Sequence, residues 1–438
     1  MQNIENTQKK SNMQKVALTA LAGTSIEWYD FFLYGAAAAL IFPTAFFGEM
    51  PPTTALLLSL LTFAAGFIAR PIGGIIFGHF GDKVGRKKTL ISALMLMGIS
   101  STLIGLLPTY AMIGVAAPIL LTTLRFAQGL AIGGQWGGAM LLVTESAPSD
   151  QRGYYGAFAQ AGAPIGVILA NLALIITSAL VSEEFFNTWG WRIPFLASAV
   201  LILISMYIQL NLEDTDAFKA LVDNKDTQSD ENIKKSPVVE AIRKYPKRIF
   251  LAAGAFLSVQ VTFYILIAFM LAYGVTSANM ARDDMLAAVL IASAIMVPVQ
   301  FIFSSYSDRH GRKGIFMSGA VLTGIWAFAI FPLVDTGNFY LIVLAITGGL
   351  VFLAMMYGPQ AAFFTELFST EVRYSGATLG YQFGAIVGGA FAPTIAVKLW
   401  TEFDIIWVSA YIALASLLTL LSVMALTETY QSDLNNTD

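Results

Sequence analysis

Long apolar stretches alternate with short polar segments along the whole chain. No Asp, Glu, Lys or Arg occurs in nine long stretches, namely residues 89–124, 153–182, 193–212, 249–281, 285–307, 314–334, 336–365, 374–397 and 405–427. Because an α-helix rises about 1.5 Å per residue, about 20 apolar residues cross the hydrocarbon core of a bilayer. The pattern therefore predicts helices that span a membrane.

Breaks at Pro, Gly and polar residues divide the chain into twelve predicted spans. The first six lie near residues 17–43, 54–80, 89–108, 112–143, 153–181 and 191–211. The other six lie near residues 247–274, 285–307, 314–334, 339–364, 374–398 and 404–426. We therefore expect an all-α, multi-pass membrane protein with twelve transmembrane helices, surrounded by the lipid bilayer.

The positions of the basic residues predict how the spans are oriented. Of the 25 Lys and Arg residues, 20 fall on the side of both termini, Arg70 and Arg125 fall within spans, and only Arg192, Arg282 and Lys398 fall on the other side. Cytoplasmic loops of membrane proteins carry an excess of Lys and Arg. This distribution predicts that both termini lie in the cytoplasm, and the absence of a cleavable signal agrees with it.

The composition narrows the class of protein. Hydrophobic residues make up 56% and charged residues 12% of the 438 positions, whereas soluble domains have about 25% charged residues. A net charge of −3 offers no surface for nucleic acid. The chain has no Cys and two His residues, His79 and His310, so we expect no metal site, no cofactor and no enzymatic activity.

The chain also divides into two similar halves. Residues 212–246 form the only long charged stretch and are predicted to be a cytoplasmic linker between six-helix bundles at 1–211 and 247–438. The loop Gly-His-Phe-Gly-Asp-Lys-Val-Gly-Arg-Lys at 78–87 returns as Ser-Ser-Tyr-Ser-Asp-Arg-His-Gly-Arg-Lys at 304–313. Such parallel repeats are typical of transporters whose substrate site lies at the midplane, between the halves.

These loops resemble the signature between the second and third helices of the major facilitator superfamily. Within that superfamily, five further segments resemble the metabolite:H⁺ symporter group, which imports shikimate, proline/betaine, citrate, 2-oxoglutarate and related organic acids. They are Glu-Trp-Tyr-Asp-Phe-Phe-Leu-Tyr-Gly at 27–35, Arg-Pro-Ile-Gly-Gly at 70–74, Arg-Phe-Ala-Gln-Gly at 125–129, Gly-Gly-Gln-Trp-Gly-Gly at 133–138 and Trp-Gly-Trp-Arg-Ile-Pro-Phe at 189–195. The resemblance implies the two-bundle fold of this superfamily and a bacterial-type inner membrane.

Two departures bear on the substrate. The group usually has Glu where this chain has Gln135, which implies that any proton or cation role of that Glu is missing. The sequence ends twelve residues after the last predicted span, at residue 438, so we expect no C-terminal coiled coil of the kind that osmosensing proline/betaine members carry.

Charged residues inside the first and fourth spans are candidates for the transport site. Glu27, Asp30 and Tyr34 share one helix face, and Arg125, Gln128 and Gln135 share another. A charge at the bilayer centre costs about 2.5–3.5 kcal/mol, so these groups are expected to face a cavity or a partner. A structural ion pair between Asp30 and Arg125 is the alternative. Arg70 fits either the cavity or the cytoplasmic end of its span.

Uncharged polar residues in other spans extend the predicted site. As substrate-binding residues we predict Arg125, Tyr34, Gln128, Gln135, Gln160, Asn171, Gln260, Tyr264, Tyr357, Gln360, Tyr381 and Gln382. Each of the uncharged groups alone fits a hydrogen bond between helices at least as well.

Charged residues in the repeated loops are predicted to form a cytoplasmic gate. They are Asp82, Arg86, Glu145, Arg152, Asp308, Arg312, Glu366 and Arg373. A carboxylate near a helix N-terminus and an Arg across the interface are mutually favourable, so these groups can latch one state and release when the halves rock. Positive charge that only sets topology is the alternative.

The resulting hypothesis is a monomeric secondary transporter that imports a small organic acid with protons. Asp30 and Glu27 are the predicted proton-coupling residues: a substrate carboxylate takes over Arg125, and Asp30 then binds a proton. Proton-coupled uptake of a zwitterion such as proline or betaine is the main alternative. A facilitator or exporter of the same fold, and a substrate sensor without transport, also remain open.

Overall fold

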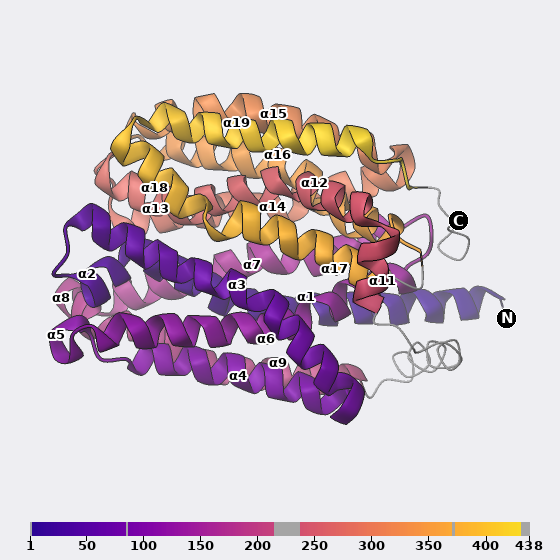
Figure 1. Cartoon of the computed structure of the whole chain (residues 1–438), viewed down its shortest axis with the longest axis horizontal. Coiled ribbons are helices and arrows are strands. Elements are labelled where there is room, and N and C mark those ends of the chain that lie inside the picture. The colour runs from indigo at the N-terminus through magenta and orange to yellow at the C-terminus, as the bar shows by residue number, and fades with distance from the viewer. Residues whose placement is uncertain (1, 85, 214–236, 370–372, 431–438) are drawn as a thin grey trace.

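The computed structural model describes the backbone of residues 2–84, 86–213, 237–369 and 373–430. It describes their side chains except at 2–12, 78–84, 86–90, 134–139, 141–142, 145–146, 208–213, 237–240 and 374. Within these residues the secondary structure is helical, without a strand. The long helices run roughly parallel to one axis, and α1 begins at the same end of the molecule at which α19 terminates (Figure 1).

Each of the twelve predicted ranges is helical. In the N-terminal half the long helices are α1 (Gln2–Leu40), α3 (Pro52–Val84), α4 (Arg86–Leu106), α6 (Ala116–Ser146), α7 (Arg152–Leu180) and α9 (Arg192–Glu213). Short segments connect them: α2 (Phe42–Phe47), α5 (Tyr110–Ile113), α8 (Glu183–Phe185) and the π-helix η1 (Phe186–Gly190).

The C-terminal half also has six long spans, two of which contain a π-helical segment. The seventh span consists of α12 (Pro246–Tyr264), the π-helix η2 (Ile265–Phe269) and α13 (Met270–Thr276). The eleventh consists of α17 (Arg373–Gly384), the π-helix η3 (Ala385–Ala390) and α18 (Ala392–Glu402). The unbroken helices are α14 (Arg282–His310), α15 (Arg312–Val334), α16 (Phe339–Glu366) and α19 (Ile405–Ala425).

Length and hydropathy support membrane crossing for most of these helices. Among the described residues nine helices are long and apolar enough to span a bilayer, or ten if the bent pair Glu183–Gly190 and Arg192–Tyr207 counts as one span. A shorter apolar helix covers Ile91–Leu106. The remaining one of the twelve predicted spans lies in α1, whose apolar part contains Glu27 and Asp30.

Two boundaries differ from the prediction. The fourth span begins at Ala116 and not at residue 112, because Gly114 has a φ of 59° and separates the short α5 from α6. The predicted linker contains the helix α11 (Pro237–Lys244), which ends on the basic residues Arg243 and Lys244. The rest of that linker, residues 214–236, lies outside the described residues.

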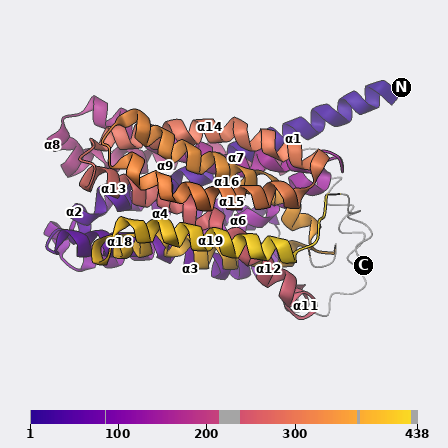
Figure 2. The same ribbon diagram turned by 90° about the horizontal axis from the view of Figure 1, so that it is seen from above.

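The two halves contact each other along α7 and α14, which lie side by side in both views (Figures 1 and 2). Further contacts join α7 to α16, α1 to η2, and α3 to η3. π-Helical segments often occur at functional sites. Here η2 begins directly after Tyr264 and contacts α1, whereas η3 begins three residues after Gln382 and contacts α3.

Glycines let α3 and α6 approach until their backbones touch. A Cβ atom at Gly129 would collide with the carbonyl oxygen of Gly66, and one at Gly133 would collide with that of Arg70. Small residues at such crossings are typical of membrane helices, which associate through close packing. This contact brings Arg70 of α3 and Arg125 of α6 next to each other.

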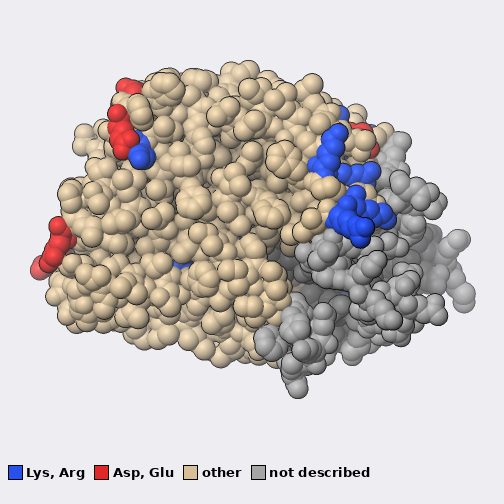
Figure 3. Space-filling model, in the orientation of Figure 1, with Lys and Arg blue, Asp and Glu red and all other residues tan. Residues whose placement is uncertain are grey.

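On the visible face of the molecule, the charged side chains collect at the two ends of the bundle (Figure 3). In the visible face, the middle is nearly free of charge, and basic side chains gather at the end where α11 lies (Figure 3). Exposed residues there include Arg243, Lys244 and Lys247. The uncharged belt is what a bilayer requires.

We expect Gly129→Val to destabilise the protein, because the larger side chain must push α3 and α6 apart. Overpacking of this kind costs about 1–3 kcal/mol, so the midpoint of thermal unfolding in detergent should fall. Gly314→Ala is the control, because a Cβ at Gly314 meets no atom within 4 Å. Equal midpoints for the two variants would contradict the proposed backbone contact.

Candidate functional site

Asp30 lies deep inside the bundle, on the face of α1 that meets α9. Its side chain is buried, with 1% relative exposure. Ser198 of α9 donates a hydrogen bond to Oδ1 of Asp30, whereas Oδ2 has no hydrogen-bond partner. A carboxylate with one unused oxygen in an apolar interior is poorly compensated, and it is therefore suited to bind a proton.

A short hydrogen-bond chain connects Arg125 to the surroundings of Asp30. Nη1 of Arg125 donates to Oε1 of Gln128 at 3.1 Å, and Nε2 of Gln128 donates to Oγ of Ser101 at 2.7 Å. Ser101 lies beside Asp30. Asp30 and Arg125 themselves, both within the described residues, form no ion pair within 4.0 Å. The structure therefore does not show the direct ion pair considered as an alternative, and the roles of both residues stay predictions.

Aromatic rings surround the guanidinium group of Arg125. Its Cζ atom lies 4.0 Å from the ring centroid of Phe31, 4.3 Å from that of Tyr34 and 4.6 Å from that of Phe63. The hydroxyl group of Tyr34 is hydrogen-bonded to Oγ1 of Thr62 at 2.7 Å. The ring face of Tyr34 thus contacts Arg125, while its hydroxyl group bonds to Thr62.

Arg70 joins the same cluster and does not point to the end of its helix. Its Cζ atom lies 4.3 Å from the ring centroid of Phe31, 4.5 Å from that of Phe67 and 5.2 Å from that of Trp28. Phe31 therefore lies against both guanidinium groups. The side chain is 1% exposed, which resolves the question that the sequence left open in favour of the interior.

Both arginines keep N–H groups that no described residue accepts. Nε and Nη2 of Arg70, and Nε and Nη2 of Arg125, are buried and have no hydrogen-bond partner. A buried donor without a partner costs about 1–3 kcal/mol, and more for charged groups. We will call Arg70, Arg125 and the rings of Trp28, Phe31, Tyr34, Phe63 and Phe67 the arginine cluster.

The C-terminal half faces this cluster with Tyr264. The hydroxyl group of Tyr264 interacts electrostatically with Arg70, and its ring lies 5.0 Å from that of Phe67 and 6.2 Å from that of Phe31. Gly389 of η3 lies against the rings of Phe67 and Tyr264. Arg70 also acts electrostatically on Tyr357 and Tyr381.

Three amides near these tyrosines carry unused hydrogen-bonding atoms. They are Nε2 of Gln260, both polar atoms of Gln360 and Oε1 of Gln382. Gln260 lies one helical turn before Tyr264, Gln360 lies one turn after Tyr357, and Gln382 follows Tyr381. The closed centre of the molecule therefore combines unused donors from one half with unused amides from the other.

Two of the predicted substrate-binding residues instead connect the halves through backbone atoms. Nε2 of Gln160 donates to the carbonyl oxygen of Tyr357 at 3.2 Å, and Nδ2 of Asn171 donates to that of Leu286 at 3.3 Å. Gln300 similarly donates to the carbonyl oxygen of Ala157 at 3.2 Å. These geometries fit the alternative of hydrogen bonds between helices.

One end of the interface is closed by a buried ionic latch. Oδ1 and Oδ2 of Asp308 accept from the backbone N–H groups of Gly153 and Tyr154 at 2.7 and 2.8 Å, at the N-terminus of α7. Nη1 of Arg312 lies 2.5 Å from Oδ1 of Asp308, and Nη2 lies 3.2 Å from Oε1 of Glu366.

Other groups complete this latch around Asp308, Arg312 and Glu366, which we will call the inner latch. Nη1 of Arg152 in α7 lies 4.0 Å from Oε1 of Glu366 in α16, so a second contact crosses between the halves. Oγ1 of Thr429 donates to Oε2 of Glu366 at 2.8 Å. Arg373 instead donates from Nε to the carbonyl oxygens of Thr365 and Phe368 at 3.1 and 3.2 Å, at the end of α16.

Several predicted residues lie outside the described side chains. They are Gln135, Asp82, Arg86 and Glu145. Their roles stay predictions. Glu27 is described and half-buried on α1.

A second latch, which the sequence analysis did not predict, closes the opposite end of the interface. Nη1 of Arg282 in α14 donates to Oδ1 of Asn187 at 3.1 Å, and Nη2 donates to Oγ of Ser178 at 3.1 Å. Ser178 in turn donates to Oδ2 of Asp283 at 2.8 Å. The sequence feature that could have indicated this latch is the position of Arg282 and Asp283 at the start of the eighth span.

This architecture, two latches around a buried polar centre, was compared with known proteins. The family model of the Major Facilitator Superfamily matches residues 20–379. The chain belongs to the Major Facilitator Superfamily. It is therefore a multi-pass membrane transporter and not an enzyme, as the sequence analysis predicted.

Relatives from this superfamily match nearly the whole chain. It is 39% identical over 431 residues to the inner membrane metabolite transport protein YhjE of Escherichia coli (strain K12), covering 97% of this chain and 96% of the relative. It is 37% identical to the shikimate transporter of the same organism, covering 94% and 93%. It is 33% identical to the proline/betaine transporter of that organism, covering 91% and 80%.

A solved structure shows the same fold. The crystal structure of a D-xylose-proton symporter aligns with a TM-score of 0.71 over 94% of this chain and 96% of the other, at 17% sequence identity. The predicted fold of the superfamily is thus confirmed.

Weakening one latch or the other should have opposite effects on how easily a reagent reaches the interface between the halves. Ala361 is fully buried near the inner latch and lies close to Gly156 of the other half. Because the chain has no Cys, Ala361→Cys supplies one reporter thiol. Asp308→Asn removes charge-assisted hydrogen bonds, so the rate of maleimide labelling should rise about tenfold, whereas Arg282→Gln should lower it.

Lys398→Gln is the control for the labelling experiment. Lys398 lies on the exposed surface, 3.7 Å from Glu402, and such pairs contribute little. Unchanged labelling in both latch variants, or an equal change in the control, would show that the latches do not govern access.

Proposed function

We propose that this transporter imports a small organic acid together with protons by alternating access. The observation that carries the proposal is the pair of buried arginines with unused N–H groups in the arginine cluster. Buried polar groups in proteins are nearly always satisfied. Donors left open at the interface between the halves are therefore suited to a ligand that supplies acceptors.

A carboxylate is the acceptor that fits these donors. The guanidinium group is planar, stays charged and binds a carboxylate through two parallel hydrogen bonds. Arg125 offers Nε and Nη2, and Arg70 offers the same pair of atoms. The aromatic rings hold both groups by their faces and leave the N–H edges free. A mono- or dicarboxylate can therefore supply the missing acceptors.

The amides of the C-terminal half suit the rest of the substrate. Gln260, Gln360 and Gln382 supply both donors and acceptors, which match hydroxyl or carbonyl groups. A ligand held by arginines of one half and amides of the other makes its full set of contacts only when the halves are closed around it. This supports coupling between binding and the movement of the halves.

Asp30 supports the proton-coupled part of the proposal. With the site empty, its carboxylate balances the positive charge of Arg125 through Ser101 and Gln128. A substrate carboxylate takes over that role, and Asp30 then binds a proton, so that less charge crosses the apolar barrier. Glu27, half-buried three residues earlier on the same helix face, is the second candidate proton carrier.

Uptake of proline or betaine is the second candidate function, since relatives with these names match most of the chain. The aromatic rings would suit a quaternary ammonium group. However, the faces of Phe31, Phe63 and Phe67 already lie against Arg70 and Arg125, at 4.0–4.6 Å. Two positively charged side chains at this position favour an anionic substrate over a cationic one.

We also propose the orientation and working unit that the sequence suggests. The end that carries α11 and the inner latch is basic, which supports a cytoplasmic location for it and for both termini in a bacterial inner membrane. The halves at 1–211 and 247–438 would rock as two bundles of one monomer. The inner latch would then close the cytoplasmic side, and the Arg282 latch the outer side.

Arg125→Lys should weaken binding of carboxylates by at least about tenfold, because an ammonium group cannot form the paired hydrogen bonds. Thermal-shift and calorimetric titrations with monocarboxylates, dicarboxylates, proline and glycine betaine measure this. Arg192→Lys is the matched control, since Arg192 donates to the carbonyl oxygens of Leu107 and Thr188 at the outer end. Betaine binding that survives while no carboxylate binds would reverse the choice of substrate class.

Asp30→Asn should abolish proton-driven accumulation in proteoliposomes but spare exchange of substrate across the membrane. An amide cannot carry the coupling proton, yet it can still hydrogen-bond to Ser198. Asp335→Asn is the control, because Asp335 accepts from the hydroxyl group of Tyr273 at 2.6 Å, away from the site. Accumulation by Asp30→Asn at the wild-type level would remove Asp30 from the mechanism, and absence of proton movement in the wild type would indicate a facilitator.

A further inference from the structure

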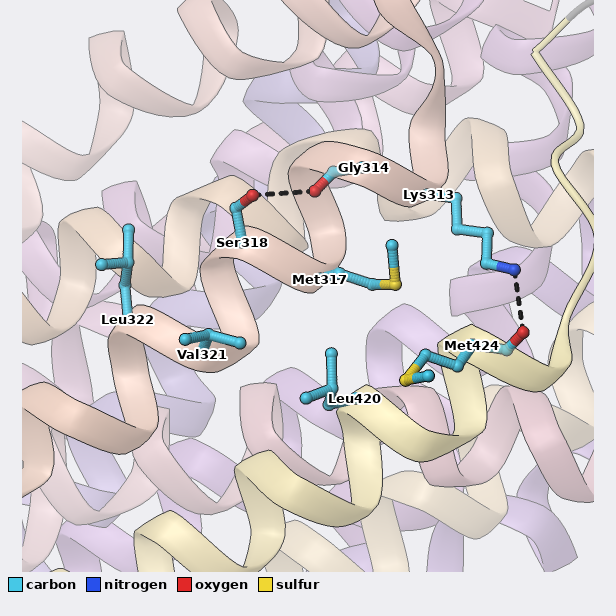
Figure 4. A pocket seen from close by; sticks show the side chains of 8 residues that line it. All are labelled: Lys313, Gly314, Met317, Ser318, Val321, Leu322, Leu420 and Met424. Atoms are coloured by element: carbon cyan, nitrogen blue, oxygen red, sulfur yellow. Dashed lines mark hydrogen bonds between the residues drawn. The ribbon is translucent and has the colours of Figure 1, made fainter.

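A groove of about 920 Å³ runs along the exposed face of the bundle between α15 and α19 (Figure 4). Its apolar lining comes from Met317, Val321, Leu322, Leu420 and Met424, and Lys313 stands at one end. None of these residues belongs to the transport site described above.

A second, smaller groove of about 370 Å³ lies on the other side of α15, against α14. Its lining includes Phe303, Tyr306 and His310. The two grooves share Gly314 and Ser318. A Cβ atom at Gly314 would meet nothing within 4 Å, so this glycine forms an open saddle across α15 that joins the grooves.

The end of this double groove is basic. Nζ of Lys313 donates to the carbonyl oxygens of Met424 and Leu426, both at 2.8 Å. An ammonium group has three donors, so one remains for a ligand. On the other side of the saddle, the exposed ring of His310 stacks on Tyr306 with centroids 4.1 Å apart.

The acidic group near Lys313, Glu428, already has hydrogen-bond partners. The carboxylate of Glu428 accepts from the backbone N–H groups of Arg312 and Lys313, each at 2.9 Å. It therefore turns toward the start of α15. Arg309, exposed in the last turn of α14, adds further positive charge.

The length of the larger groove matches half a bilayer. Lys313 and Leu322 are nine residues apart on one helix, which corresponds to about 14 Å at 1.5 Å per residue. One leaflet contributes about 15 Å of a hydrocarbon core that is about 30 Å thick. The groove thus reaches from the level of lipid headgroups almost to the midplane.

We propose that this double groove binds one anionic diacyl phospholipid. The phosphate group lies at the free donor of Lys313, the glycerol unit crosses the saddle at Gly314, and one acyl chain occupies each groove. The positive charge selects an anionic headgroup, whereas the paired apolar grooves select two chains over one.

Native mass spectrometry of the full-length protein in detergent tests this site, with the first lipid bound as the readout. Wild-type protein should retain dioleoyl phosphatidylglycerol about fivefold more tightly than dioleoyl phosphatidylcholine, the effect of one basic residue near an anionic lipid. Lysophosphatidylglycerol, which has one chain, should bind more weakly than its diacyl counterpart.

Two variants separate the parts of the site. Lys313→Gln should remove the preference for the anionic headgroup, and Gly314→Leu should weaken both diacyl lipids by filling the saddle. Lys398→Gln, at the other end of the bundle, and Ala294→Leu, on the exposed face of α14, are the matched controls and should behave like the wild type.

Several results would overturn the proposal. Equal retention of phosphatidylglycerol and phosphatidylcholine by the wild type excludes the anionic site, even if neither variant folds. Undiminished binding by Gly314→Leu excludes the saddle. An equal loss in Lys398→Gln would show that general surface charge, and not this groove, retains the lipid.

Discussion

Two guanidinium groups lie close together in the apolar centre of the bundle, and the rest of the structure must accommodate them. Such charges are expensive away from water, yet no carboxylate among the described side chains lies within ion-pair distance of Arg70 or Arg125. Aromatic ring faces and the hydrogen bond to Gln128 stabilise them in part. The N–H edges remain unsatisfied, which makes the empty closed site costly and gives an anionic ligand its advantage.

Packing of small residues makes this arrangement sterically possible. A Cβ at Gly66 would come within 2.7 Å of Nε of Arg125, so a larger side chain there would displace the guanidinium group. Gly129 and Gly133 allow the same two helices to touch along their backbones. The glycines of α3 and α6 therefore serve the site as well as the fold, because they set how far two charged side chains reach into the interior.

Hydropathy and charge predicted the helices well, since a bilayer demands long apolar segments and leaves few alternatives. Periodicity also placed Asp30 and Arg125 in the interior. It could not distinguish Gln128, which orients Arg125, from Gln160, which bonds to the backbone of another helix, because both are amides on apolar helices. The rings of Phe31 and Phe63 and the latch at Arg282 depend on contacts between distant segments, and their residue types carry no distinctive pattern.

The two latches differ in their exposure to water, and this difference bears on the transport cycle. The ion pair that crosses between the halves at the inner latch joins Arg152 to Glu366, whose side chains are 10% and 0% exposed, whereas the hydrogen bond from Arg282 to Asn187 at the other latch is exposed. Exposed polar pairs contribute about 0–1 kcal/mol, while leaving one partner of a buried ion pair uncompensated costs about 3–5 kcal/mol. We therefore expect the inner latch to be harder to open than the Arg282 latch. In the proposed transport cycle, contacts that a substrate makes across the arginine cluster and the facing amides would supply the difference.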